Sequence, residues 1–216
     1  MRRHPDPCGS GSPLANPRRG WGEAWAVRNG FRLIAGLDEA GRGPWAGPVV
    51  AAAVVLTRQR FHVRIDDSKR LTPRQREHAF EAIHAQADVG VGIASHTIID
   101  RDNILQATRR AMQAAIAQLQ HAPQFLLVDG PFKPLSDIPQ RNLIHGESQS
   151  VSIACASIVA KVTRDRLMRF YDRLFPEYGF AGHKGYGTEA HLASLKMHGP
   201  SPLHRCSFRP IAELLR

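Results

Sequence analysis

Short apolar runs, bounded by Gly, Pro or charged residues, predict five β-strands. They cover residues 31–37, 49–56, 89–95, 124–128 and 142–145, and each has the length and composition of a strand. A Gly- and Pro-rich segment at residues 40–48 joins the first two runs. We therefore expect these two strands to form a hairpin with an elaborate turn.

Apolar residues three and four apart predict three helices. Thr72, Pro73 and Gln75 carry the signature of a capping box with Pro at the first helical position, and a helical face continues to about residue 87. Residues 104–120 and 150–174 repeat the helical spacing. Strands interleaved with helices in this order predict an α/β fold, with a five-stranded mixed sheet flanked by helices.

The remaining segments predict the domain organisation. Residues 1–28 are basic, contain Gly-Ser and Pro clusters and lack apolar periodicity, so we expect a flexible tail whose Trp21 and Trp25 pack weakly at most. Residues 29–175 would form the core. Residues 176–216 would form a small C-terminal helical extension that contributes to ligand binding.

Composition narrows the class of protein. The 216 residues are 43% hydrophobic, enough for one sizeable core, and the net charge of +10 attracts polyanions such as nucleic acids. Three cysteines fit neither a disulfide framework nor paired zinc ligands, so we expect reduced thiols, with Cys155 packed in a helix. No apolar block resembles a membrane helix or a secretory signal. We expect a cytoplasmic protein, a monomer, with no membrane partner.

Acidic residues mark the ends of two apolar strands. Asp38 and Glu39 end the first, and Asp129 ends the fourth. Buried acids are costly unless a cation binds them, and they converge if the two strands are parallel neighbours. The alternative is that each acid caps a turn in water, Asp129 as part of an Asp-Gly pair.

A fourth acid, Glu147, precedes the longest helix. With the other three it would form an oxygen-only cluster, which suits Mg²⁺ or Mn²⁺ rather than zinc. Asp165 is a competing ligand, but it lies roughly 27 Å further along a straight helix, so we assign it a surface or packing role.

One segment also matches a motif of dinucleotide-binding proteins. Residues 41–46 match the GxGxxA pattern, and Asp66 and Asp67 lie near where a ribose-binding acid would be. We reject this reading because the β-branched residues after Pro48 favour a strand where the site needs a helix. The acids at 38 and 39 would also repel phosphates.

Seven motifs, in order, resemble the bacterial type 2 ribonucleases H, the ribonuclease HII family, from about residue 33 to 210. They are DEAGRGP at 38–44, AGPVV at 46–50, DSK at 67–69, VDG at 128–130, ASIVAKVTRD at 156–165, HKGYGT at 183–188 and HRCSF at 204–208. The resemblance implies a ribonuclease H-like fold. It also implies hydrolysis of RNA in RNA–DNA hybrids, and cleavage on the 5′ side of single ribonucleotides in duplex DNA, leaving 3′-hydroxyl and 5′-phosphate ends.

The resemblance also implies residue roles. The family's four acids fall on Asp38, Glu39, Asp129 and Glu147, which would hold two Mn²⁺ or Mg²⁺ ions when substrate is bound. Many relatives carry Asp where this chain has Glu147, and Lys where it has His145. Because Glu reaches one methylene further, this departure bears on the preferred metal.

Substrate recognition falls on further residues. By resemblance, Gly41, Arg42 and Gly43 read the 2′-hydroxyl together with Tyr186. We also expect Lys69, Lys161, Lys184 and Arg205 to follow the phosphate backbone, and His183 and His204 to be structural. For each basic residue taken singly, a solvated surface charge is the alternative.

Three rival functions remain. Another nuclease or integrase with the same acids would cut without a 2′-hydroxyl. A binding module would not need the acids together. A nicotinamide-dependent oxidoreductase would need a helix after Gly43.

Overall fold

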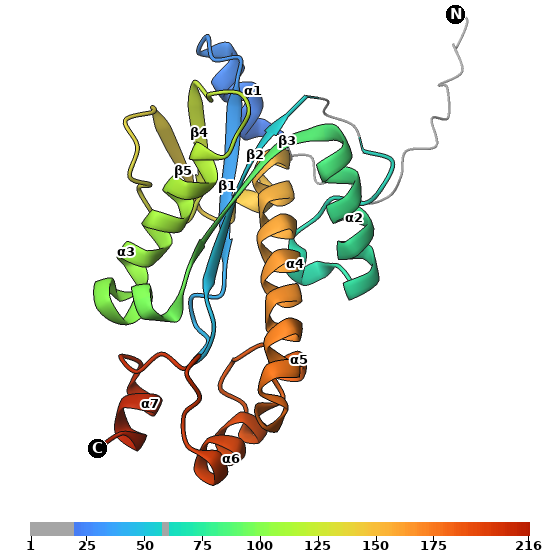
Figure 1. Ribbon diagram of the computed structural model, residues 1–216. Coiled ribbons are helices and arrows are strands. Elements are labelled where there is room, and N and C mark those ends of the chain that lie inside the picture. The colour runs from blue at the N-terminus through green and yellow to red at the C-terminus, as the bar shows by residue number, and fades with distance from the viewer. Residues whose placement is uncertain (1–19, 58–60) are drawn as a thin grey trace, which may run out of the picture.

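The computed structural model describes residues 20–57 and 61–216, and five strands form one mixed sheet (Figure 1). The sheet order is β3-β2-β1-β4-β5. The strands are β1 (Ile34–Ala40), β2 (Val49–Leu56), β3 (Ala87–Ala94), β4 (Phe125–Asp129) and β5 (Gln140–Leu143). Strand β1 is antiparallel to β2 and parallel to β4. The predicted α/β class, the hairpin and the parallel β1–β4 pair are all confirmed.

Helices cover both faces of the sheet. Helix α3 (His96–Ala117) lies on one face, and α4 (Val151–Leu174) lies on the other with α2 (Pro73–Gln86) outside it (Figure 1). The capping box of α2 is present at Thr72 and Gln75. Cys155 is buried within α4, as predicted.

Helix α3 begins eight residues before the predicted start. Ser95 caps the helix by accepting the Ile98 N–H, and Ile99 is buried, so the first turns are anchored on the sheet. Asn103 has φ 68°, which interrupts the helix and hid the earlier turns from a search for unbroken helical spacing.

A glycine lets α4 approach the sheet closely. A Cβ on Gly36 would lie 2.2 Å from the Ser152 carbonyl carbon, so no larger residue fits there. Because Gly36 is two residues before Asp38 on the same face of β1, the close approach brings the start of α4 beside the end of the strand.

The predicted tail is wrong for residues 20–28. Residues 21–28 form helix α1 (Trp21–Arg28), in which Ala26 is fully buried and Trp25 packs against Phe125. Cation–π contacts place Arg141 over the rings of Trp21 and Trp25. The helix is too short for apolar periodicity to reveal it, and its stability comes from these contacts. The tail prediction for residues 1–19 lies outside the described residues.

Residues 176–216 form helices α5 (Phe180–His183), α6 (Glu189–His198) and α7 (Arg209–Leu214) below the sheet (Figure 1). Their apolar residues pack on Ala46 and Met168, so the extension is attached to the turn between β1 and β2 and to the end of α4. That turn leads directly into β2 and contains no helix, which removes the dinucleotide-binding reading. None of the helices in the described part combines the length and apolar composition that a membrane crossing requires.

Candidate active site

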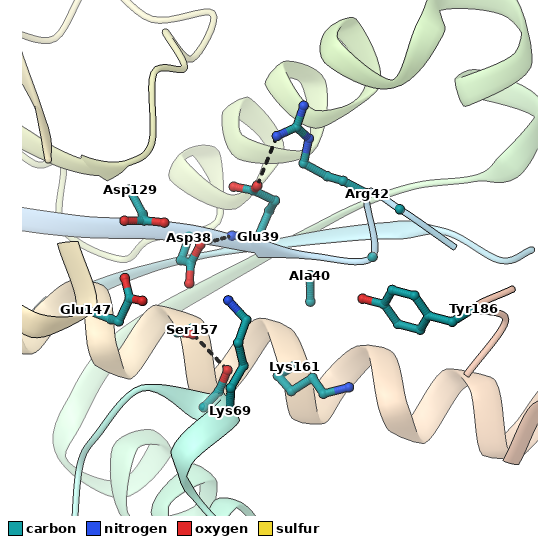
Figure 2. Close-up of a pocket in the computed structure, with 13 residues that line it drawn as sticks. Asp38, Glu39, Ala40, Arg42, Lys69, Asp129, Glu147, Ser157, Lys161 and Tyr186 are labelled. Atoms are coloured by element: carbon teal, nitrogen blue, oxygen red, sulfur yellow. Dashed lines mark hydrogen bonds and ion pairs between the residues drawn. The ribbon is translucent and has the colours of Figure 1, made fainter. Parts of the chain in front are cut away.

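Strand register brings Asp38 and Asp129 together. Leu37 of β1 pairs with Val128 of β4, and both side chains lie in the core on the α3 side. Side chains alternate along a strand, so the next residues, Asp38 and Asp129, both point to the α4 side. Figure 2 shows the two carboxylates side by side at the strand ends.

The other two acids come from different positions around the same strand ends. Glu39 follows Asp38 and points the other way, with its Oε1 3.8 Å from Nη1 of Arg42 (Figure 2). Glu147 lies in the short turn Gly146–Ser148 that leads into α4. The Gly146 N–H donates to Asp129 Oδ1 at 2.6 Å, which ties this turn to β4.

A cavity of about 500 Å³ joins all four acids to most of the predicted substrate residues. Its lining consists of Asp38, Glu39, Ala40, Gly41, Arg42, Gly43, Ser68, Lys69, Asp129, Glu147, Ser157, Lys161 and Tyr186. These residues come from β1, β4, α4, the C-terminal extension and three connecting segments (Figure 2). The predicted convergence of acids from distant parts of the chain is therefore present.

Burial raises the pKa of three of the acids. The pKa of Asp38 is raised well above its usual range by burial and by the neighbouring Glu39 and Asp129 carboxylates. Burial raises the pKa of Glu39 to about 7, with Asp129 adding to the rise and Arg42 opposing it. Burial also raises the pKa of Glu147, and the Asp129 carboxylate adds to the rise. Excess negative charge in a buried place is the environment that a bound cation relieves.

The donor set fits divalent cations. Within the described part of the chain, Glu39 Oε2 and Glu147 Oε2 are buried without a hydrogen-bond partner, and the carboxylates offer only hard oxygen donors. Among the described residues, no group of three or more His, Cys, Asp or Glu side chains forms a complete metal-binding site by itself. The acids instead surround a shared space, which suits ions that also take oxygens from a phosphodiester and from water.

The Gly-Arg-Gly segment forms the wall beside the acids. Gly41 has φ 94°, and a Cβ there would lie 1.9 Å from Arg164 Nε, so only glycine fits. The Arg42 guanidinium lies 4.2 Å from the Phe132 ring centroid. On the opposite wall, Lys69 extends towards the acids, and the Lys161 side chain lies along α4 (Figure 2).

Arg205 does not occupy the predicted position along a phosphate backbone. It is fully buried and donates to the carbonyls of Gly41, Arg42 and Gly47 at 2.6, 2.9 and 2.9 Å. A fork of guanidinium donors matches the converging carbonyls of a tight turn, which the sequence motif alone does not reveal. Arg205 thus fixes the Gly-Arg-Gly segment from behind.

Arg164, which the sequence analysis did not single out, also holds backbone carbonyls behind this wall. It is buried and donates to the carbonyls of Pro48, Lys184 and Ala46 at 3.0, 3.0 and 3.2 Å. Ser157, also missed, lines the cavity. Residues 157, 161 and 164 are spaced four and three apart, so the helical periodicity of the ASIVAKVTRD motif was the available signal.

Tyr186 projects from the C-terminal extension, with its hydroxyl towards Ala40 (Figure 2). A chain of hydrogen bonds holds its backbone. The Ser201 N–H donates to His204 Nδ1, His204 Nε2 lies 2.9 Å from His191 Nε2, and His191 Nδ1 lies 2.9 Å from the Tyr186 carbonyl. Because His204 Nδ1 accepts, the proton of neutral His204 sits on Nε2, and that of His191 sits on Nδ1.

The histidines are structural, as predicted for His183 and His204. His183 stacks on His191 with ring centroids 4.3 Å apart, and its Nδ1 accepts the Gly185 N–H. Burial lowers the pKa of His191 and of His204 to about 4, which keeps both rings neutral at neutral pH.

Lys184 lies outside the cavity of the acids. It lines an adjoining groove of about 480 Å³ with Arg74, Arg76, Arg169 and Lys161. Lys161 lines both spaces and pairs with Asp165 at 2.7 Å. Asp165 is therefore a packing partner in the groove and not a member of the acidic cluster, as the distance along the helix predicted.

The family model and the curated relatives agree on one family, and the solved structures share the fold. Residues 35–211 match the family model of ribonuclease HII. Over 194 residues, 89% of both chains, the chain is 54% identical to a ribonuclease HII from Geobacter sulfurreducens. The crystal structure of the ribonuclease H2 from Pyrococcus horikoshii matches with a TM-score of 0.72 and 25% identity, over 85% of this chain and 97% of that one. A Bst-RNase HIII in complex with Mn²⁺ has a TM-score of 0.65 at 24% identity, over 88% and 71% of the two chains, and supports the fold.

Proposed function

The chain belongs to the ribonuclease HII family and is a ribonuclease H endoribonuclease, and from this premise we propose that it cuts on the 5′ side of single ribonucleotides embedded in duplex DNA as well as within RNA–DNA hybrids. The products would carry 3′-hydroxyl and 5′-phosphate ends. The observation that carries the proposal is the shared cavity, in which four acids face a Gly-Arg-Gly wall, two lysines and a tyrosine.

The acids are proposed to hold two divalent ions, Mg²⁺ or Mn²⁺. When bound, such ions lower the pKa of an attacking water and stabilise the leaving 3′ oxygen. Asp38 and Asp129 would provide the central ligands because they lie side by side on one face of the sheet. Glu39 and Glu147 would complete the set from either side with their unpartnered oxygens.

The substrate would be read by the walls of the cavity. The carbonyls of Gly41 and Arg42 are held by Arg205, so the segment that approaches the nucleotide is rigid before substrate arrives. A 2′-hydroxyl both donates and accepts, and it would find backbone groups here and the Tyr186 hydroxyl opposite. The Tyr186 ring, 44% exposed, would stack on the following deoxyribose.

The basic groove is proposed to continue the substrate track. Arg74, Arg76, Lys161, Arg169 and Lys184 outnumber the two acids of the groove, Glu77 and Asp165. Lys161 connects the groove to the cavity, so a duplex seated on the acids would pass its phosphates along it. Residues 176–216 would contribute to substrate binding through Lys184 and Tyr186.

A duplex with one ribonucleotide tests the proposal. The protein is incubated with this duplex and with an all-DNA duplex of the same sequence, in EDTA, Mg²⁺ or Mn²⁺, and the cut is mapped to the nucleotide. We expect one cut 5′ of the ribonucleotide, with either metal and not in EDTA. Cleavage of the all-DNA duplex would instead indicate a nuclease or integrase that does not read the 2′-hydroxyl, and binding without cleavage would indicate a binding module.

A further inference from the structure

Helix α1 contacts the segment that immediately follows Glu147. The N–H groups of Gly20 and Gly22 donate to the Gln149 carbonyl at 3.0 and 3.1 Å. Helix α1 packs closely at Gly22: a Cβ there would lie 3.1 and 3.2 Å from methyl carbons of Leu127 and Leu143. The start of α1 thus bonds to the residue that follows the Gly146–Ser148 turn and packs against β4 and β5.

Glu23 adds a buried carboxylate to this contact. Its Oε1 accepts from Ser150 Oγ at 2.6 Å, from Ser152 N at 2.9 Å and from Ser152 Oγ at 2.8 Å. The side chain is nearly fully buried, and among residues 20–57 and 61–216 its Oε2 has no hydrogen-bond partner. Burying a carboxylate with one oxygen unpartnered costs free energy, so we expect an effect of Glu23 beyond capping the helix.

Helix α4 already has its own cap. Ser150 Oγ accepts the Ile153 N–H at 3.1 Å, which satisfies the donor that an N-cap residue normally serves. Glu23 therefore acts on the Ser150 hydroxyl itself and on the next free backbone donor, that of Ser152. Its effect is to fix where the start of the helix lies relative to α1 and the sheet.

The path from Glu23 to Glu147 is short and made of hydrogen bonds. Within the turn, the N–H groups of Gln149 and Ser150 both donate to the Gly146 carbonyl, at 2.9 and 2.8 Å. At its other end the turn is tied to Asp129 by the Gly146 N–H. Since Glu147 Oε2 has no partner of its own, the position of this carboxylate depends on the backbone of the turn.

We infer that Glu23 is a positioning residue for Glu147: by holding Ser150 and Ser152 it sets the turn that presents the Glu147 carboxylate to a divalent cation. The inference rests on the proposed role of Glu147 as a metal ligand. It gives α1, which lies outside the sheet and its covering helices, a function in the active site.

Mn²⁺ binding to the full chain tests the inference without relying on catalysis. Affinity is measured by isothermal titration calorimetry, at a temperature where near-UV circular dichroism shows every variant folded. We expect Glu23→Ala to weaken Mn²⁺ binding by about tenfold, as supporting residues behind metal ligands do, and Glu23→Gln by about threefold because the amide oxygen still accepts. The isosteric Glu23→Gln keeps the test available if Glu23→Ala does not fold.

The matched control is Asp88→Ala. Asp88 is also a buried carboxylate that accepts backbone N–H groups, those of Gln120 and His121, but it lies on β3 opposite Val55, at the far end of the sheet from the acids. We expect this variant to lose stability and to bind Mn²⁺ like the parent.

A double-mutant cycle with Glu147→Ala completes the test. If Glu23 acts through Glu147, adding Glu23→Ala to Glu147→Ala causes no further loss of Mn²⁺ affinity. The inference is overturned if Glu23→Ala and Glu23→Gln bind Mn²⁺ like the parent, or if the loss is the same in both backgrounds. If Asp38→Asn and Glu147→Ala also bind like the parent, the assigned metal site itself is wrong, whereas loss in those two alone overturns only the role of Glu23.

Discussion

Two regions of this molecule bury charged groups, and they do so in opposite ways. In the acidic cavity, carboxylates are buried beside one another, two oxygens lack partners, and the pKa of Asp38, Glu39 and Glu147 is raised. Behind the Gly-Arg-Gly wall, Arg164 and Arg205 are buried more deeply than the acids, but each donates to three carbonyls.

The difference indicates that the acids serve the reaction and that the buried arginines hold the backbone in place. The carboxylates of the cavity repel one another without a neutralising partner, so a bound cation would stabilise it. The arginine layer is complete within the protein, and although burial lowers the pKa of Arg164 to about 10 and that of Arg205 to about 9, both remain charged at neutral pH. We therefore expect loss of a group from the cavity to impair activity and spare the fold, and loss from the arginine layer to impair the fold.

The largest expected effect is that of Asp38→Asn. Cleavage should fall by at least about a thousandfold, because a proposed central metal ligand is lost. Binding of an RNA–DNA hybrid should remain within about twofold, because the proposed phosphate contacts come from separate basic residues. In EDTA the variant should be more stable than the parent, since one of the repelling buried acids is gone. Single-turnover cleavage, fluorescence anisotropy and urea unfolding measure the three quantities.

Full activity of Asp38→Asn in Mg²⁺ would refute the site. Lower stability in EDTA would contradict the comparison itself, because it would mean that the carboxylate contributes to the fold as the arginines do.

Arg205→Met should have the opposite profile. Methionine fills part of the space but leaves three buried carbonyls without donors, so we expect a loss of roughly 3 to 5 kcal/mol in the free energy of unfolding. Arg209→Met is the matched control, because Arg209 is exposed on α7 and pairs with Glu213, and it should unfold at the same urea concentration as the parent. If Arg205→Met unfolds at the same urea concentration as the parent, the arginine layer is not a structural element.

The sequence predicted the acidic cavity better than the buried arginines behind it. Asp38 and Asp129 were found because acids at the ends of apolar strands are unusual, and parallel strands bring such ends together. The part played by Arg205 was wrong and that of Arg164 was missed, because the carbonyls that they bind come from a turn whose shape exists only after folding.

Helix α1 shows the same limit. Its eight residues are too short a stretch for helical periodicity to show, and Glu23 has no special pattern around it. Its importance comes from Ser150 and Ser152, 127 and 129 residues further along the chain. Contacts between distant polar groups of this kind leave no periodic signal.

The buried histidines predict how stability depends on pH. The pKa of His191 and of His204 is about 4 in the folded protein, below the value of about 6.5 in an unfolded chain. As pH falls below 6.5 the unfolded chain therefore takes up protons first, so the stabilisation is present above pH 6.5 and is lost as pH falls towards 4. We expect the pair to account for a loss of roughly 3 to 5 kcal/mol over this range, measured by urea unfolding.

His204→Asn isolates this contribution, because an Asn oxygen is able to accept the Ser201 N–H as Nδ1 does. The variant should be less stable at pH 7.5 but should lose less stability between pH 6.5 and 4. His198→Asn, at the end of α6, should keep the steep dependence of the parent. Equal slopes in parent and His204→Asn would show that the pair does not stay neutral.

The smallest expected effect concerns Tyr186, where the two regions meet. Its ring faces the cavity, while the Arg164 guanidinium lies 5.8 Å from its centroid and its carbonyl faces His191. Tyr186→Ala should reduce cleavage at a single ribonucleotide by about tenfold, because stacking and one hydrogen bond are lost, and should weaken hybrid binding by less than about threefold. Tyr186→Phe keeps the ring and removes only the hydroxyl, so it should separate stacking from reading of the 2′-hydroxyl. If Tyr186→Ala cuts the single-ribonucleotide duplex as fast as the parent, the residue belongs to the structural layer alone, and specificity for the ribonucleotide must come from the Gly-Arg-Gly segment.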